Sequence, residues 1–340
     1  MAGNVYGVDI GTSNIKLYNR DKGEILNEKN IIAIANKKEV FAYGDNAFEM
    51  EGKAPENIKV SFPVKDGVVA DVDNMCELFK LFYKKSNKGK KASGDDFYVA
   101  IPTDITDVEK RAFYELIIDA KVKPKNIYII DKPVADAIGA GINVTSAQGV
   151  MVVDIGADTT EISVLSLGGI VISKSVKIAG KKFDDNIIMT VKKKYNLVIG
   201  NKTAETLKKN LASAIETEET FLPIYGRDVV SGLPVKVEIS SKDIFDCLNE
   251  PIYSIIDAIK VILERTPPEL AADIIDTGVY LSGGSSSIKN INDLIAKETG
   301  LKVVMVDTPE ESVIRGVKEV ITNAKEYVGI AKVPKEKNYI

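Results

Sequence analysis

The 340-residue sequence contains no histidine and no tryptophan, and it has only two cysteines. Without histidine, Ser-His-Asp and Cys-His catalysis are excluded, and so are zinc sites with histidine ligands. Cys76 and Cys247 lie far apart in the sequence, so we expect two buried thiols in a reducing compartment rather than a disulfide. Any chemistry must therefore use carboxylates, lysines, hydroxyl groups and a bound cation.

Several kinds of segment are also missing. Residues 1–4 lack the basic start and apolar core of a signal peptide, and no apolar run reaches the length of a transmembrane helix. A net charge of −4 gives no reason to expect a nucleic-acid surface. The 45% hydrophobic and 28% charged content is typical of a globular protein, which at this length has two or three folding units. We therefore expect a cytoplasmic protein without a nucleic-acid partner.

One pattern occurs twice and organises the chain. Residues 5–14 and 151–160 each contain an apolar run, then Asp-Ile-Gly, then small polar residues. This predicts a buried strand that ends in a sharp turn with a carboxylate at its end. Asp9 and Asp154 lie 145 positions apart, which predicts a duplicated domain with a ligand held between two equivalent turns. The alternative is that each copy is only a turn at a strand end.

A third glycine turn follows the apolar start of residues 279–286, which read Val-Tyr-Leu-Ser-Gly-Gly-Ser-Ser. Glycines at such a turn let backbone N–H groups approach a phosphate or a sugar. Between the second and third turns the pattern predicts several helices. One begins at about residue 240, and a separate one covers 249–266.

The three turns, in this order, resemble those of the superfamily that contains actin, heat-shock chaperones and sugar kinases. Within it the chain is similar to the MreB family of bacterial actins. The resemblance implies an α/β protein with the actin-like fold, a duplicated ribonuclease-H-like fold of two domains and four subdomains with nucleotide in the interdomain cleft. The matching segments are spread over almost the whole chain. They are residues 5–14, 63–71, 138–141, 194–200, 226–228, 231–234 and 266–274.

The resemblance also implies the limits of both domains. Domain I would comprise residues 1–145, with a small subdomain at about 31–62. Domain II would comprise residues 146–330, with a small subdomain at about 178–243. The remaining residues, 331–340, would form a C-terminal tail.

The resemblance implies that the chain binds ATP or ADP with Mg²⁺, and it places phosphate and metal at the first two turns. Backbone N–H groups of the first turn would cradle the β-phosphate, and Gly156 would belong to the second phosphate turn. Asp9 and Asp154 would hold Mg²⁺, mostly through water. The residues of the first turn are Thr12, Ser13 and Asn14.

The resemblance places the adenosine against the third turn, at Gly283, Gly284 and Ser285. Glu205 and Lys208 match the family's ribose and base contacts. The alternative for these two residues is an exposed charge pair, since they lie three positions apart on one predicted helix.

The sequence departs from the family at the positions that would hydrolyse ATP. The family's Asp-Ile-Gly-Gly-Gly-Thr is Asp-Ile-Gly followed by Ala157, Asp158 and Thr159 here, which adds Cβ atoms and a negative charge near the expected γ-phosphate. The family's water-positioning glutamate aligns with Lys132, and a charged lysine cannot accept a proton from the attacking water. We expect at most a slow ATPase, with Lys132 and Asp158 paired across the γ-phosphate site. The alternative is that the two residues changed independently.

The function that the resemblance implies is an ATP-binding, filament-forming cytoskeletal protein that serves cell shape, or motility in a wall-less cell. Subunits would stack head to tail, because a heterologous contact that does not close produces a filament. Paired protofilaments and other MreB-like proteins are further expected partners. Only five of the 45 basic residues are arginine, which is typical of an AT-rich genome and fits a wall-less bacterium.

Membrane contact is expected to be at most electrostatic, at the inner face of the membrane. The lysine-rich residues 86–96 have no apolar tip that could insert into lipid. The alternatives in function are a plasmid-segregation actin and a small-metabolite kinase of the same superfamily. A kinase needs a catalytic base beside its acceptor, and Lys132 does not supply one.

Overall fold

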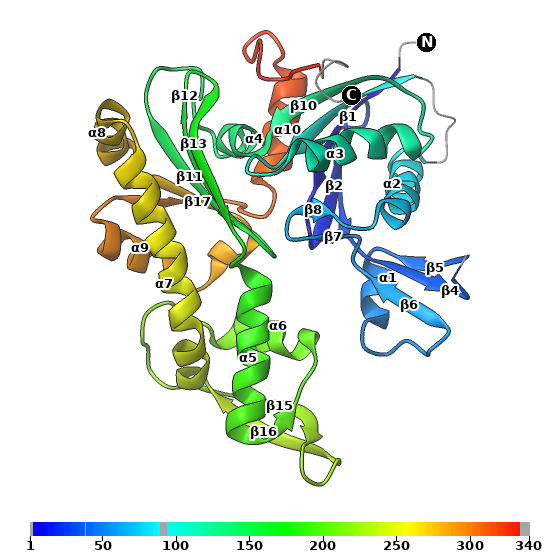
Figure 1. Ribbon diagram of the computed structural model, residues 1–340, viewed down its shortest axis with the longest axis vertical. Helices are drawn as coiled ribbons and strands as arrows, with labels where there is room; N and C mark the ends of the chain where they lie inside the picture. The colour runs from blue at the N-terminus through cyan, green and yellow to red at the C-terminus, as the bar shows by residue number, and fades with distance from the viewer. Residues whose placement is uncertain (1–2, 38, 89–93, 334–340) are drawn as a thin grey trace. The chain divides into compact units, whose positions relative to one another are not determined.

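The computed structural model describes residues 3–37, 39–88 and 94–333. Parts of the predicted lysine-rich loop (89–93) and of the predicted tail (334–340) therefore lie outside the described residues. Figure 1 shows the course of the chain, which forms two compact units. Unit 1 comprises residues 1–148, 165–173 and 310–340, and unit 2 comprises residues 149–164 and 174–309.

Unit 1 is built on a five-stranded sheet with the order β10-β9-β1-β2-β3. The central strand β1 pairs antiparallel with β2 and parallel with β9, which pairs parallel with β10. All six residues of β1 are buried, as expected for an apolar strand covered on both faces. The strands are β1 (Val5–Ile10), β2 (Asn14–Asn19), β3 (Glu24–Lys29), β9 (Asp95–Ile101) and β10 (Pro124–Asp131).

Two helices of unit 1 begin at side-chain caps and pack on this sheet. The carboxylate of Asp71 accepts from the N–H of Asn74 at the start of α2, and Thr106 and Glu109 form a capping box at the start of α3. Apolar residues at helical spacing on α2 and α3 join the core of the sheet. The helices of unit 1 around this sheet are α2 (Val72–Ser86), α3 (Asp107–Asp119), α4 (Lys132–Gly139) and α10 (Ser312–Thr322).

The helices α4 and α10 lie side by side (Figure 1) and approach each other through glycines. A Cβ at Gly316 would overlap the carbonyl oxygen of Ala135, and one at Gly139 would overlap that of Ser312. The Ser312 hydroxyl also donates to the buried carboxylate of Asp136. This contact joins α10 to unit 1, whereas the domain limits implied by the sequence place α10 in domain II.

A second five-stranded sheet, most of which belongs to unit 2, repeats the sheet of unit 1. Its order is β13-β12-β11-β17-β18, and β11 pairs parallel with β17, which pairs parallel with β18. Strand for strand this is the order in unit 1, so the two Asp-Ile-Gly runs mark a repeat of the whole sheet. The strands are β11 (Val150–Ile155), β12 (Thr160–Ser166), β13 (Gly169–Val176), β17 (Val279–Ser282) and β18 (Val303–Met305). The end of β12 and most of β13 fall within residues 165–173, which are counted with unit 1.

The long helix α7 (Ser241–Arg265), drawn in yellow in Figure 1, is continuous where the sequence predicts two helices. Pro251 inside it has no backbone N–H, so the carbonyl group of Cys247, four residues earlier, loses its usual donor. That carbonyl accepts instead from Asn186 Nδ2 at 3.0 Å. Asn186 belongs to α5 (Gly180–Tyr195), which lies beside α7. The neighbouring helix therefore supplies the hydrogen bond that Pro251 cannot make.

Each unit also carries a small three-stranded sheet. In unit 1 its order is β5-β4-β6, and in unit 2 it is β14-β15-β16. No helix in the described part of the chain has both the length and the hydrophobicity needed to cross a bilayer. The remaining elements of unit 1 are β4 (Ile32–Ala35), β5 (Glu39–Tyr43), α1 (Asp45–Met50), β6 (Ile58–Ser61), β7 (Val64–Lys65) and β8 (Val68–Val69). Those of unit 2 are β14 (Leu197–Val198), α6 (Asn201–Leu211), β15 (Phe221–Asp228), β16 (Pro234–Ser240), α8 (Pro268–Thr277), the 3₁₀ helix η1 (Gly284–Ser287) and α9 (Ile291–Thr299).

Candidate functional site

The two Asp-Ile-Gly turns have the same backbone geometry. In the first turn the N–H of Gly11 donates to the carbonyl oxygen of Asn14 at 3.0 Å, and in the second the N–H of Gly156 donates to that of Thr159, also at 3.0 Å. A Cβ at Gly11 or Gly156 would lie 2.9 or 3.0 Å from the same acceptor oxygen. Glycine is therefore needed for this close approach in both turns.

Two carbonyl groups of the first turn are held by Asn30, a buried residue that follows β3. Asn30 Nδ2 donates to the Gly11 carbonyl at 2.8 Å, and the Asn30 N–H donates to the Ser13 carbonyl at 2.8 Å. Within the described residues, the N–H groups of Thr12 and Ser13 have no hydrogen-bond acceptor. A turn in which these two carbonyl groups are bonded and two N–H groups are available is suited to bind an anion.

Asp9, at the end of β1, is buried against Lys16 of β2. Its Oδ2 accepts from Lys16 Nζ at 2.9 Å, and only 5% and 9% of the two side chains are exposed. The pairing follows from the β1–β2 register, in which the two residues lie opposite each other. One carboxylate oxygen is thus already bound to an ammonium group. Asp9 therefore fits the predicted water-mediated contact with Mg²⁺ better than direct ligation.

Direct binding of a metal by side chains depends on how the possible ligands are grouped in the described residues. Among the described residues there is no group of three His, Cys, Asp or Glu side chains that could hold an ion directly. Mg²⁺ in nucleotide sites usually keeps several waters and binds through one or two carboxylates and the phosphates of the substrate. Asp9 in unit 1 and Asp154 in unit 2 each supply a carboxylate of that kind.

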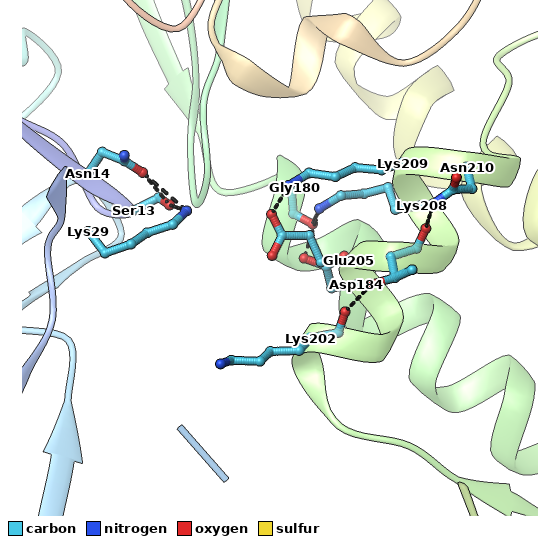
Figure 2. A network of polar contacts seen from close by, with 11 residues as sticks. Ser13, Asn14, Lys29, Gly180, Asp184, Lys202, Glu205, Lys208, Lys209 and Asn210 are labelled. Atoms are coloured by element: carbon cyan, nitrogen blue, oxygen red, sulfur yellow. Dashed lines mark hydrogen bonds and ion pairs between the residues drawn. The ribbon is translucent and has the colours of Figure 1, made fainter. Parts of the chain in front are cut away.

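Lys29, the last residue of β3, lies against the side chains of the first turn. Its Nζ donates to Ser13 Oγ at 3.2 Å and to Asn14 Oδ1 at 3.3 Å. Dashed lines in Figure 2 mark both contacts. It also lies 5.0 Å from the centre of the Phe48 ring. The structure therefore places an ammonium group at the turn that the resemblance assigns to the β-phosphate, and the sequence alone does not identify it.

In unit 2 the second and third turns are in contact. The hydroxyl of Ser285 donates to the carbonyl of Gly156 at 2.7 Å. Gly283 has a φ of 82°, and a Cβ there would overlap Asp154 Oδ1, so only glycine fits. Gly284 follows as the first residue of η1. The structure thus brings together predicted site residues that lie 129 positions apart.

Lys208 of α6 is bound inside unit 2 rather than exposed on a helix face. Its Nζ donates to the Gly180 carbonyl at 2.9 Å and to Asp184 Oδ2 at 2.8 Å (Figure 2). Burial raises the pKa of the Asp184 carboxyl group, and the Lys208 ammonium opposes this rise. Gly180 in turn faces the third turn, since a Cβ there would lie 2.5 Å from Ser285 Oγ. Lys208 therefore holds the backbone next to Ser285.

The remaining predicted residues lie on the helices α6 and α4 and in the second turn. Glu205 pairs with Lys209, four residues later on α6, at 2.7 Å. Lys132 is the first residue of α4 in unit 1. In unit 2, Asp158 is buried in the second turn, and Thr159 supplies the carbonyl that closes that turn. The pairing of Lys132 with Asp158 stays a prediction.

Comparison with known proteins identifies the family. The family model described as MreB/Mbl protein matches residues 3–328. The chain belongs to the MreB/Mbl family. Mbl of Bacillus subtilis (strain 168), a cell shape-determining protein, is 39% identical over 333 residues, which are 97% of this chain and 98% of that protein. The family resemblance predicted from the sequence is therefore confirmed.

Solved structures confirm the fold of this MreB/Mbl-family chain. MreB5 of Spiroplasma citri, crystallised with AMPPNP or with ADP, is 33% identical and covers 96% of this chain and 98% of its own, with TM-scores of 0.91 and 0.90. MamK in a double helical filament has a TM-score of 0.78 at 19% identity and covers 94% of this chain and 98% of its own. That likeness supports the fold alone. The predicted α/β, actin-like fold is thus confirmed.

Proposed function

We propose that this chain binds ATP or ADP with Mg²⁺ and assembles into filaments that serve cell shape, or motility in a cell without a wall. The carrying observation is the pair of Asp-Ile-Gly turns, closed by the same hydrogen bond in two sheets of the same strand order. The binding of AMPPNP and ADP by MreB5 of Spiroplasma citri supports the nucleotide part of the proposal.

The first turn takes the β-phosphate in this proposal. The N–H groups of Thr12 and Ser13 and the neighbouring Asn14 face it, because Asn30 satisfies the carbonyl groups of Gly11 and Ser13. Mg²⁺ would neutralise charge on the phosphate groups. The residues proposed to hold the water shell of the metal are Asp9 and Asp154.

The second and third turns take the rest of the nucleotide. Gly156 contributes to the second phosphate turn, and its carbonyl is bound by Ser285. Gly283, Gly284 and Ser285 lie against the adenosine. Glu205 and Lys208 on α6 serve the ribose and base, and the Lys208–Gly180 bond supports this assignment because Gly180 adjoins Ser285.

The proposed partner of the chain is another copy of itself. Subunits stack head to tail, singly or as paired protofilaments, and other MreB-like proteins are candidate partners. The proposed location is the cytoplasm, with at most electrostatic contact at the inner face of the membrane. Nucleotide binding would favour the conformation that assembles, because a ligand shifts a protein toward the state that it binds more tightly.

Electron microscopy and calorimetry test the proposal. We expect filaments with ATP and Mg²⁺, and fewer or shorter filaments with ADP or without nucleotide, because ATP favours the assembling state. Titration calorimetry should show binding of ATP to the same preparation. Absence of ATP binding together with absence of filaments under all three conditions would contradict the proposal.

Hydrolysis should be slow in the wild type and faster in the double variant Lys132→Glu/Asp158→Gly. The variant restores a group that accepts a proton from the attacking water and removes a negative charge near the γ-phosphate, so we expect phosphate release to rise at least about tenfold. Phosphate release under saturating ATP measures the effect.

A control for this prediction is Lys59→Glu, which makes the charge change of Lys132→Glu alone at an exposed position on β6. It should leave phosphate release unchanged. Wild-type turnover equal to or above that of the double variant would show that Lys132 and Asp158 do not limit hydrolysis. ATP-dependent phosphorylation of a small metabolite would instead favour the kinase alternative.

A further inference from the structure

We propose that Lys29 is a phosphate-binding residue of the first turn. The inference rests on the proposed function, because it adds a side chain to the same nucleotide site. It concerns unit 1 alone, where Lys29, Ser13, Asn14 and Asn30 are all placed by the same three strands and the turn between them.

Two of the contacts of Lys29 are weak ones for an ammonium group. Its Nζ lies 3.2 Å from the hydroxyl of Ser13 and 3.3 Å from the side-chain carbonyl of Asn14 (Figure 2), and both oxygens are uncharged. An ammonium group forms shorter and stronger hydrogen bonds with an anionic oxygen than with a neutral one. A phosphate at the turn would therefore be a better partner than either of these side chains.

The position of the ammonium group is set before any ligand binds. The β2–β3 register places Lys29 opposite Asn14. The N–H of Lys29 donates to Asp45 Oδ1 at 3.2 Å, and its Nζ lies over the face of Phe48. A cation over an aromatic ring is stabilised there. Because the side chain already lies at the turn, little rotamer freedom remains to be lost on binding.

The backbone of the turn matches the same kind of ligand. Asn30 binds the carbonyl groups of Gly11 and Ser13, and the N–H groups of Thr12 and Ser13 have no acceptor within the described residues. Backbone N–H groups and a lysine ammonium group are the usual partners of phosphate oxygens. The backbone and the Lys29 side chain of unit 1 therefore both favour a polyanion at this turn.

The other lysine at the turn has a different role. Lys16 is buried and bonded to the Asp9 carboxylate at 2.9 Å, so its charge is matched by a carboxylate inside the protein. Lys29 is only partly buried, and its Nζ lies on the side-chain oxygens of the turn itself. Of these two lysines, Lys29 is the one placed to meet a phosphate.

Titration calorimetry with ATP and Mg²⁺ tests the inference on four proteins: the wild type, Lys29→Gln, Lys29→Arg and the control Lys59→Gln. Loss of one charge-assisted hydrogen bond should weaken ATP binding about tenfold in Lys29→Gln. Lys29→Arg keeps the positive charge and should stay within about threefold of the wild type. Lys59, exposed on β6, should tolerate the change to glutamine without loss of affinity.

The outcomes separate this inference from the proposed function. If the wild type does not bind ATP, both are overturned. If the wild type binds ATP and Lys29→Gln binds it equally well, only the role of Lys29 is overturned, and the lysine merely ties β3 to the turn.

A second measurement uses the wild type alone and so does not depend on the folding of a variant. Amines are acetylated with a limiting reagent, and the extent at each lysine is read by mass spectrometry. ATP with Mg²⁺ should slow acetylation of Lys29 at least about threefold, because a bound phosphate covers the amine, and should leave Lys59 unaffected. Equal acetylation of Lys29 with and without ATP, at saturating ATP, would overturn the inference.

Discussion

Replacing Gly316 with alanine should destabilise the protein by about 3 kcal/mol or more. Helix propensity alone predicts the opposite, since alanine favours a helix over glycine by about 1 kcal/mol. Packing decides the sign, because a Cβ at Gly316 would overlap the Ala135 carbonyl oxygen and lie 2.6 Å from its carbonyl carbon. Those atoms are backbone of α4 and cannot rotate away. The two helices would have to separate, with loss of the Ser312–Asp136 hydrogen bond.

Urea unfolding followed by circular dichroism measures the effect of Gly316→Ala as a lower transition midpoint. Gly169→Ala is a matched control, because the nearest atom to a Cβ there is the Ser166 carbonyl oxygen at 3.8 Å, an ordinary contact. The control should lie within about 0.5 kcal/mol of the wild type. A midpoint for Gly316→Ala at or above that of the wild type would show that α4 and α10 do not pack through these glycines.

The same contact explains why the domain limits could not be read from the sequence. The two Asp-Ile-Gly runs mark where each sheet begins, and the sheets do repeat from those points. The path of α10 depends instead on Gly139 and Gly316, which are far apart in sequence and meet only in the fold. No local pattern in the chain records that pairing, so α10 joins unit 1 without a signal in its own sequence.

Pro251 shows a similar limit in the prediction of secondary structure from the sequence. A proline preceded by polar residues is a sound reason to end one helix and begin another. The continuous α7 depends on Asn186, which donates to the Cys247 carbonyl from a different helix. Tertiary contacts of this kind compensate for a local break, and propensity cannot foresee them.

Some residues of the candidate site could be predicted from the sequence, and others could not. The turns, with Asp9, Gly11, Asp154 and Gly156, were predictable because an apolar strand followed by aspartate and glycine is a specific signal for a sharp turn. The pairing of Lys16 with Asp9 follows from the same turn. The hydrogen bond between Gly11 and Asn14 closes a hairpin, and in its register residue 16 lies opposite residue 9. The sequence pattern treats lysine as a surface residue, and only the register shows that this one is buried.

Lys29, Asn30 and Gly180 required the structure. Asn30 binds the first turn from the chain segment after β3, and Gly180 meets the third turn across more than 100 positions of sequence. Their roles come from contacts with backbone atoms of other segments. Such contacts do not produce a recognisable pattern in the sequence. Binding turns are thus easier to predict than the residues that hold them.

Replacing Lys16 with methionine should destabilise the protein by about 3 to 5 kcal/mol, because it leaves the Asp9 carboxylate buried without its partner. Methionine keeps the unbranched shape of the side chain and removes only the charge. The Lys16–Asp9 pair is buried, with 9% and 5% of the side chains exposed and a 2.9 Å contact. A buried charge that loses its partner is more costly than a buried neutral group.

A double-mutant cycle and an exposed pair test this explanation by urea unfolding. Lys16→Met/Asp9→Asn should recover part of the loss, since the uncompensated charge is gone. Lys80 and Glu77 form an ion pair of the same length, 2.9 Å, with about half of each side chain exposed, and Lys80→Met should cost less than about 1 kcal/mol. If Lys16→Met were no more destabilising than Lys80→Met, or if the double variant were less stable than Lys16→Met alone, the Asp9 charge would not be the cause. The two ion pairs have the same length and differ in burial. A larger loss of stability in Lys16→Met than in Lys80→Met would therefore be due to the burial of the Lys16–Asp9 pair.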